Sequence, residues 1–225
     1  MNKRNAVIIL SGGMDSVTTL AIAKNEGYEC FCITFNYGQK SISEINSAKF
    51  YSNKYNSLEH KIFNIDFNDF TESSLITENI LVPDKNSSNS IPSTYVPMRN
   101  VIFLSIACSW AEQINSSDIF LGANAIDYSG YPDCRDDFIS AYEKMINLGS
   151  KTGVEGNSFR IHRPLVSMRK KDIVFLGKSL GLDYKKSVSC YQATNDGKAC
   201  GNCESCDFRK KAFEENGFTD ETIYI

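Results

Sequence analysis

The stretch VIILSGGMDS, residues 7 to 16, places a short apolar run directly before Ser-Gly-Gly and Asp-Ser. The run covers residues 6 to 10 and is typical of a strand buried on both faces of a parallel sheet. Apolar residues then recur at helical spacing as far as Gly27, which favours the end of a helix. The stretch therefore predicts a strand, a tight turn and a helix.

The turn in this stretch has the composition of an anion-binding loop. Gly12 and Gly13 allow a sharp turn that brings backbone N–H groups close to a ligand, and the following helix presents its positive end. Ser11 and Ser16 can add hydroxyl donors. The loop has neither the Gly-Lys-Ser/Thr ending of a Walker loop nor a G-x-G-x-x-G pattern. The glycines alone fit a simple connection as well as a phosphate site.

Strand-like and helix-like segments alternate along the rest of the chain, which predicts an α/β fold with a doubly wound, mainly parallel, five-stranded sheet. Residues 68 to 98 are polar and weakly periodic, as in a functional loop. Ser41 or Ser43 is the expected cap of the second helix. Further strands are predicted at 29–38, 60–67, 117–124 and 159–166, and helices at 41–56, 100–113, 138–149, 169–181 and 207–213.

Composition is that of an ordinary globular protein. Of 225 residues, 42% are hydrophobic and 23% are charged, and the formal net charge is -3. A negative chain offers a polyanion no general attraction, so we expect no nucleic-acid partner. The N-terminus lacks a signal-peptide core, and no run approaches the roughly 20 apolar residues of a membrane span. We expect a cytoplasmic protein that does not contact membranes.

Four of the eight cysteines lie close together near the end of the chain. Cys190, Cys200, Cys203 and Cys206 have the spacing C-x9-C-x2-C-x2-C, which suits one tetrahedral Zn²⁺ with no open position for water. An iron–sulfur cluster or a redox pair is the alternative, but the ferredoxin pattern with its trailing Cys-Pro is absent. We therefore divide the chain into an α/β domain that contains the glycine loop, residues 1 to 185, and a zinc-binding segment with a helix, residues 186 to 225.

Several motifs carry a resemblance to a known family. SGGMDS after a buried strand resembles the SGGxDS signature of the PP-loop ATP pyrophosphatases. FNYGQKSISE (35–44), YVPMRN (95–100), AIDYSGYPDCR (125–135) and the cysteine tail resemble the 7-cyano-7-deazaguanine synthase family, from about residue 7 to residue 213. Ser41 and Met98 depart from the family pattern, which has histidine and glycine there, whereas Glu44 matches its acidic residue.

The resemblance implies an adenine nucleotide alpha-hydrolase-like sheet and an ATP-dependent carbon–nitrogen ligase of queuosine biosynthesis. Such an enzyme converts 7-carboxy-7-deazaguanine and ammonia to 7-cyano-7-deazaguanine by adenylating first a carboxylate and then an amide. We expect AMP and pyrophosphate as direct products, ATP with Mg²⁺ as cosubstrate, one structural Zn²⁺ per chain, and a homodimer. The implied ATP-binding residues are Leu10, Ser11, Gly12, Gly13, Met14, Asp15, Ser16 and Val17.

The same resemblance supplies candidates for chemistry and substrate binding. A planar deazapurine acid needs an aromatic face, in-plane hydrogen-bonding groups and a cation near its carboxylate. Taken singly, each candidate also fits a structural role in a turn, a solvated ion pair or a helix start. The implied catalytic residues are Asp15, Ser16, Arg99 and Lys170, and the implied substrate-binding residues are Asp127, Tyr128, Tyr131, Asp133 and Arg135.

Two other functions compete with this interpretation. One is a PP-loop tRNA-modifying enzyme of the thiolase type, which needs a persulfide-bearing cysteine and a basic RNA surface. The other is a non-catalytic, zinc-tailed nucleotide-binding module. His60 and His162 fit packed positions on strands better than catalysis, and Cys134 fits packing at least as well as chemistry.

Overall fold

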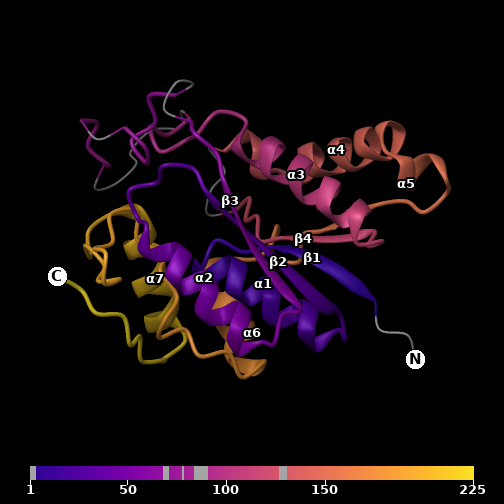
Figure 1. Cartoon of the computed structure of the whole chain (residues 1–225). Helices are drawn as coiled ribbons and strands as arrows, with labels where there is room; N and C mark the ends of the chain where they lie inside the picture. The colour runs from indigo at the N-terminus through magenta and orange to yellow at the C-terminus, as the bar shows by residue number, and fades with distance from the viewer. Residues whose placement is uncertain (1–3, 68–70, 78, 84–90, 127–130) are drawn as a thin grey trace.

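A five-stranded parallel sheet forms the centre of the protein (Figure 1). The computed structural model describes residues 4–67, 71–77, 79–83, 91–126 and 131–225. The strand order is β3-β2-β1-β4-β5, and each of the four pairings is parallel, which confirms the predicted fold class. The strands are β1 (Asn5–Ile9), β2 (Glu29–Asn36), β3 (Glu59–Asn64), β4 (Asp118–Leu121) and β5 (Arg160–His162).

Helices cover both faces of the sheet, with α3, α4 and α5 on one side and α1, α2, α6 and α7 on the other (Figure 1). A short 3-10 helix, η1 (Pro132–Cys134), precedes α4. The helices are α1 (Met14–Asn25), α2 (Ser43–Lys54), α3 (Arg99–Gln113), α4 (Asp136–Gly149), α5 (Lys151–Val154), α6 (Lys170–Ser179) and α7 (Glu204–Glu215).

The first strand divides the core into two layers. Val7 and Ile9 join the hydrophobic cluster that contains α3 and α4 residues, whereas Ala6 and Ile8 join the cluster that contains α1, α6 and α7 residues. All four side chains are buried. Because successive strand residues point to opposite faces, a continuous apolar run is what a strand covered on both faces requires.

Some local predictions were wrong. Ile42 precedes α2 as its cap residue, without a side-chain cap, so neither Ser41 nor Ser43 has the expected role. The last strand is much shorter than predicted, because the chain turns after His162. Helix α5 was not predicted, since four residues capped by Ser150 are too short to show a helical repeat.

The C-terminal segment packs against the α/β body. Ala212 and Phe213 of α7 belong to the same hydrophobic cluster as α1 and α6 residues. Arg209 is 2% exposed, and its guanidinium donates to the Ser187 hydroxyl at 2.8 Å and to Asp220 at 3.0 Å. Across the described ranges, no helix combines the length and apolar character that spanning a bilayer requires.

Candidate functional site

An open pocket lies at the carboxyl ends of the central strands, between β1, β2 and β4. Its walls include Leu10 after β1, Tyr37 after β2 and Gly122 after β4. Strands β1 and β4 are neighbours, and the helices that follow them cover opposite faces of the sheet. Open α/β sheets bind ligands at such a switch point. The glycine loop therefore borders the position where the fold favours a ligand.

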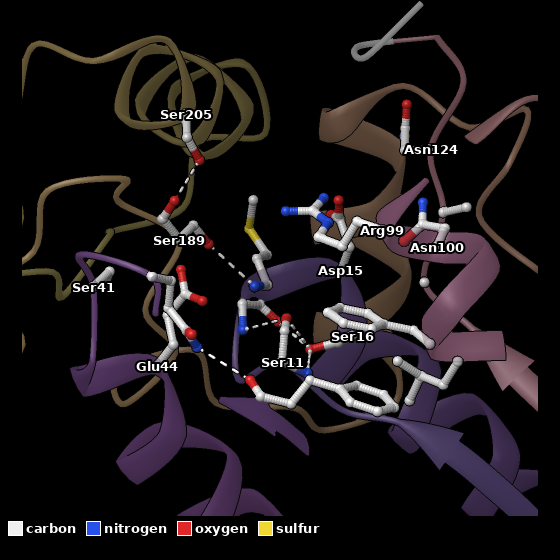
Figure 2. Close-up of a pocket in the computed structure, with 18 of the residues that line it drawn as sticks. Ser11, Asp15, Ser16, Ser41, Glu44, Arg99, Asn100, Asn124, Ser189 and Ser205 are labelled. Atoms are coloured by element: carbon white, nitrogen blue, oxygen red, sulfur yellow. Dashed lines mark hydrogen bonds between the residues drawn. The ribbon is translucent and has the colours of Figure 1, made fainter. Parts of the chain in front are cut away.

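Serine hydroxyls hold the glycine loop (residues 11 to 16) in shape (Figure 2). The Ser16 hydroxyl accepts hydrogen bonds from the backbone N–H groups of Ser11 and Gly12, at 3.2 and 3.1 Å. The Ser11 hydroxyl accepts from the N–H of Gly13 at 3.2 Å. These N–H groups converge at the start of α1, where an anion gains from the helix dipole. Phosphate oxygens can take the place of the hydroxyls without leaving a donor unpaired.

Gly12 brings the loop into close contact with α2. Its φ is +90°, and a Cβ added there would lie 2.2 Å from the carbonyl oxygen of Glu44 and 2.7 Å from the nitrogen of Ala48. The Gly12 carbonyl accepts from the Ser47 hydroxyl at 2.7 Å and from the backbone N–H of Val188 at 3.0 Å. Only glycine fits this position, because both the backbone angle and the space exclude a side chain.

The Gly12→Ala variant is expected to lose both stability and nucleotide binding. The clash with the α2 backbone adds to the cost of a positive φ, which is about 1 kcal/mol or more. Gly27→Ala is the matched control, because Gly27 has φ +85° and open space around its would-be Cβ. Urea unfolding should show a larger loss of stability for Gly12→Ala. Equal losses for the two variants would contradict the steric argument.

Asp15 and Lys170 form a mostly buried ion pair beside the loop. Asp15 lies in the first turn of α1 and Lys170 begins α6. The Lys170 ammonium donates to both carboxylate oxygens, at 2.7 and 2.8 Å, and the two side chains are only 7% and 17% exposed. The structure thus brings two of the four predicted catalytic residues into direct contact, and all four line the pocket.

Arg99 lies on the α3 side of the same pocket (Figure 2). Its guanidinium donates to the Tyr37 hydroxyl at 3.1 Å. Burial opposes its charge, but the nearby Tyr37, Tyr131 and Asp133 side chains outweigh that effect and raise the pKa of Arg99. Arg99 is therefore a permanent cation in the pocket wall, suited to a carboxylate or phosphate.

The predicted substrate-binding residues separate into three groups. Tyr131 lines the pocket and exchanges a short hydrogen bond with the Thr94 hydroxyl. Asp133 instead accepts from the backbone N–H of Asn100 at 2.9 Å, and Arg135 is exposed before α4. Neither of these two is among the described residues that line the pocket. Asp127 and Tyr128 lie outside the described residues.

Sequence reasoning did not single out Ser189, which joins the glycine loop to the C-terminal segment. Its hydroxyl accepts from the backbone N–H of Met14 at 3.1 Å, and its carbonyl accepts from the Ser205 hydroxyl at 2.6 Å. Both serines line the pocket. The available signal was the position of Ser189 next to Cys190, because a metal ligand fixes its neighbours in the chain.

The four tail cysteines meet at one point. Their sulfur atoms all lie within 4.8 Å of one another, at the start of α7 and in the preceding loop. The sulfurs of Cys203 and Cys190 are 4.0 Å apart, close to the roughly 3.8 Å edge of a tetrahedron with 2.3 Å metal–sulfur bonds. Interactions with the sulfurs of Cys190 and Cys206 lower the pKa of the Cys203 thiol. The donor set suits a thiolate-bound metal ion.

The two histidines lie away from the described pocket wall. His60 exchanges a hydrogen bond with the Thr34 hydroxyl at 2.8 Å, and burial lowers its pKa. His162 stacks on Phe120 with its Nε2 2.6 Å from Asp118. Cys134 does line the pocket, but burial raises its pKa to about 11. A protonated thiol of this kind is a poor nucleophile.

Comparison with known proteins shows which family the sequence matches. A family model described as queuosine biosynthesis protein QueC matches residues 5 to 217. A 7-cyano-7-deazaguanine synthase from Cellvibrio japonicus is 49% identical over 224 residues, with 100% of this chain and 99% of that protein covered. A 7-cyano-7-deazaguanine synthase from Stutzerimonas stutzeri is also 49% identical, with both chains fully covered.

Solved structures support the fold at lower identity. NMN synthetase from Francisella tularensis has a TM-score of 0.51 and 16% identity, over 97% of this chain and 79% of that one. A predicted subunit of a tRNA methyltransferase from Methanocaldococcus jannaschii has a TM-score of 0.50 and 16% identity, over 99% and 92%. At such identities the similarity concerns architecture alone.

Proposed function

Because this chain belongs to the queuosine biosynthesis protein QueC family, we propose that it converts 7-carboxy-7-deazaguanine, ammonia and ATP to 7-cyano-7-deazaguanine through adenylated intermediates. The observation that carries the proposal is the glycine loop, placed beside the Asp15–Lys170 pair and Arg99 in one pocket. A loop without a Walker lysine suits release of pyrophosphate, with AMP transferred to the substrate oxygen. The route needs two rounds of this activation, on the acid and then on the amide.

For the first step, the loop backbone and the hydroxyls of Ser11 and Ser16 bind the departing pyrophosphate. The Asp15 carboxylate supplies an oxygen ligand of the type that Mg²⁺ prefers, and Lys170 fixes its orientation. A Mg²⁺ ion held by the Asp15 carboxylate would supply positive charge to the phosphates. Leu10, Gly13 and Met14 line the pocket and complete the proposed nucleotide site, whereas the predicted residue Val17 is buried in the core and is not among the described lining residues.

For the substrate, Arg99 binds the carboxylate and Tyr131 offers an aromatic edge on the same side of the pocket. Asp127 and Tyr128 remain proposed contacts to the base. Asp133 and Arg135 do not line the described pocket wall, so we propose that they support the substrate site without contacting the substrate. Asp133 connects η1 to the start of α3 through its hydrogen bonds with Asn100. That connection orients Arg99, the residue that precedes Asn100.

We propose that the four cysteines bind one structural Zn²⁺ per chain, since four thiolates leave no coordination position for substrate. We also propose residues 1 to 185 as the nucleotide-binding unit and residues 186 to 225 as the metal-binding segment. A cytoplasmic homodimer without nucleic acid completes the proposal. The backbone edge of β3 is unpaired on its outer side in the five-stranded sheet, and a second copy can cover such an edge.

An assay of pyrophosphate release with 7-carboxy-7-deazaguanine, ammonium and MgATP tests the function. We expect release that depends on the deazaguanine acid, together with a nitrile product by mass spectrometry. A parallel assay replaces the deazaguanine acid with tRNA as the substrate. Turnover that depends on tRNA would replace the proposal with the thiolase type, and nucleotide binding without either turnover would favour the non-catalytic module.

A further inference from the structure

The proposed reaction requires a group that accepts protons from nitrogen. When ammonia attacks an adenylated carboxylate, the nitrogen must lose a proton for a neutral amide to form. No histidine is among the described residues that line the pocket. The acceptor must therefore be another titratable group.

Most titratable side chains of the pocket are unsuited to this task. The Asp15 carboxylate is held by Lys170 through both of its oxygens. Burial keeps the Cys134 thiol protonated, with its pKa raised to about 11. Lys40 donates to the carbonyl oxygen of Ile80 at 2.7 Å. In the described wall, Asp15 and Glu44 are the two carboxylates.

Glu44 differs from Asp15 in having no hydrogen bond or salt bridge from its carboxylate to the described residues. It lies in the first turn of α2 and lines the pocket, with part of its side chain open to the cavity. Figure 2 shows it on the α2 side of the pocket, with Arg99 and Asn100 on the α3 side. The carboxylate is thus available to a ligand.

The position of Glu44 is fixed by the loop it faces. Its carbonyl oxygen contacts Gly12 so closely that a Cβ there would lie 2.2 Å away. The N-terminal turn of α2 is thereby seated against the backbone that binds the departing pyrophosphate in the proposed function. A base attached to that turn is therefore held in the wall of the same pocket as the glycine loop.

We propose that Glu44 is the catalytic base that accepts the proton from nitrogen when ammonia attacks the adenylated carboxylate. The carbon–nitrogen bond forms, the bond between the carbonyl carbon and the AMP oxygen breaks, and AMP leaves with the electron pair. One nitrogen proton passes to the Glu44 carboxylate, which then releases it to water. This assignment rests on the proposed function and adds the residue that performs its proton transfer.

The electrostatic setting of Glu44 suits a base near neutral pH. Burial raises its pKa to about 8, and the opposing cation Arg99 limits the rise. The Tyr37 hydroxyl is the other titratable group that faces it, and burial keeps that phenol protonated by raising its pKa. General bases work best when their pKa lies near the operating pH.

The Glu44→Gln variant separates adenylation from nitrogen attack. ATP–pyrophosphate exchange with the acid and no ammonia measures adenylation, and we expect it to remain within a few-fold of wild type. Amide formation from ammonia should fall by about 100-fold or more, the usual contribution of a general base. Glu44→Asp should retain part of the rate. Glu155→Gln, at an exposed glutamate directly after α5, should match wild type.

The pH profile gives a second measurement. With rates expressed per concentration of unprotonated ammonia, the wild-type kcat/KM should rise with pH and level off above about pH 8, because the base must be ionised. Glu44→Gln should give a low, flat profile. Equal loss of exchange and amide formation, or an unchanged profile, would overturn the assignment. Absence of acid-dependent exchange in wild type would instead overturn the proposed function.

Discussion

The Asp15→Asn variant is expected to slow acid-dependent ATP–pyrophosphate exchange by about 100- to 1,000-fold, the usual effect of removing one electrostatic contact at a reacting centre. Asparagine fits the same space but offers one oxygen and no charge to Lys170 or to a cation. The Lys170 side chain, 7% exposed, then loses the carboxylate charge that faces it in the wild type. Exchange kinetics with labelled pyrophosphate measure the loss.

A double variant separates the chemical role of this pair from its structural role. Breaking a buried pair costs on the order of 3 kcal/mol, whereas replacing both partners by residues without charge is often neutral. Asp15→Asn combined with Lys170→Met should therefore recover stability in urea unfolding but not exchange activity. Asp183→Asn, in an exposed pair with Lys54, is the control and should change neither. Recovered activity in the double variant would contradict the catalytic assignment.

The Cys203→Ser variant is expected to lose its bound metal and much of its thermal stability. Cys203 is fully buried, with its sulfur 3.5 Å from that of Cys206. Binding a structural zinc contributes about 10 kcal/mol or more to the order of such a segment, so loss of one thiolate ligand is costly. Metal analysis by mass spectrometry should give one zinc per wild-type chain and substoichiometric zinc in the variant.

The same variant is expected to raise the KM for ATP, because the segment reaches the glycine loop. Cys190, one of the four proposed metal ligands, follows Ser189, whose hydroxyl accepts from the Met14 N–H at 3.1 Å. Cys108→Ser is the matched control, since Cys108 is equally buried but lies on α3 away from the cluster. It should keep its metal and its KM. Stoichiometric zinc in Cys203→Ser would refute the four-thiolate site. Iron and visible absorbance in the wild-type protein would show that the cysteines bind an iron–sulfur cluster and not zinc.

The sheet and its helices were predictable because their signals are local. The apolar run before Gly12 and the helical repeat after it lie within one stretch of sequence, and each later strand repeats the pattern. The errors were local too. Ser41 and Ser43 have the composition of caps, but the chain turns at Ile42 and leaves both hydroxyls unpaired among the described residues. A capping preference is weaker than the packing that seats α2 against the loop.

The site was less predictable because its contacts are distant in sequence. Motif resemblance pointed to Asp15, Arg99 and Lys170, yet nothing in the residues around Lys170 indicates a partner 155 positions away. Asp133 was predicted at the substrate and instead bonds to Asn100, a contact that depends on how η1 meets α3. Ser189 had no motif of its own. Such placements follow from tertiary packing.

The distance in sequence between Asp15 and its partners also sets the order in which the protein matures during synthesis. The loop is synthesised before both partners, and its contacts with Lys170 and Ser189 span 155 and 175 residues. Contacts of this span form only after most of the chain exists. A nascent chain that ends before Lys170 can thus pair β1 with β2 while the Asp15 carboxylate still lacks its ammonium partner.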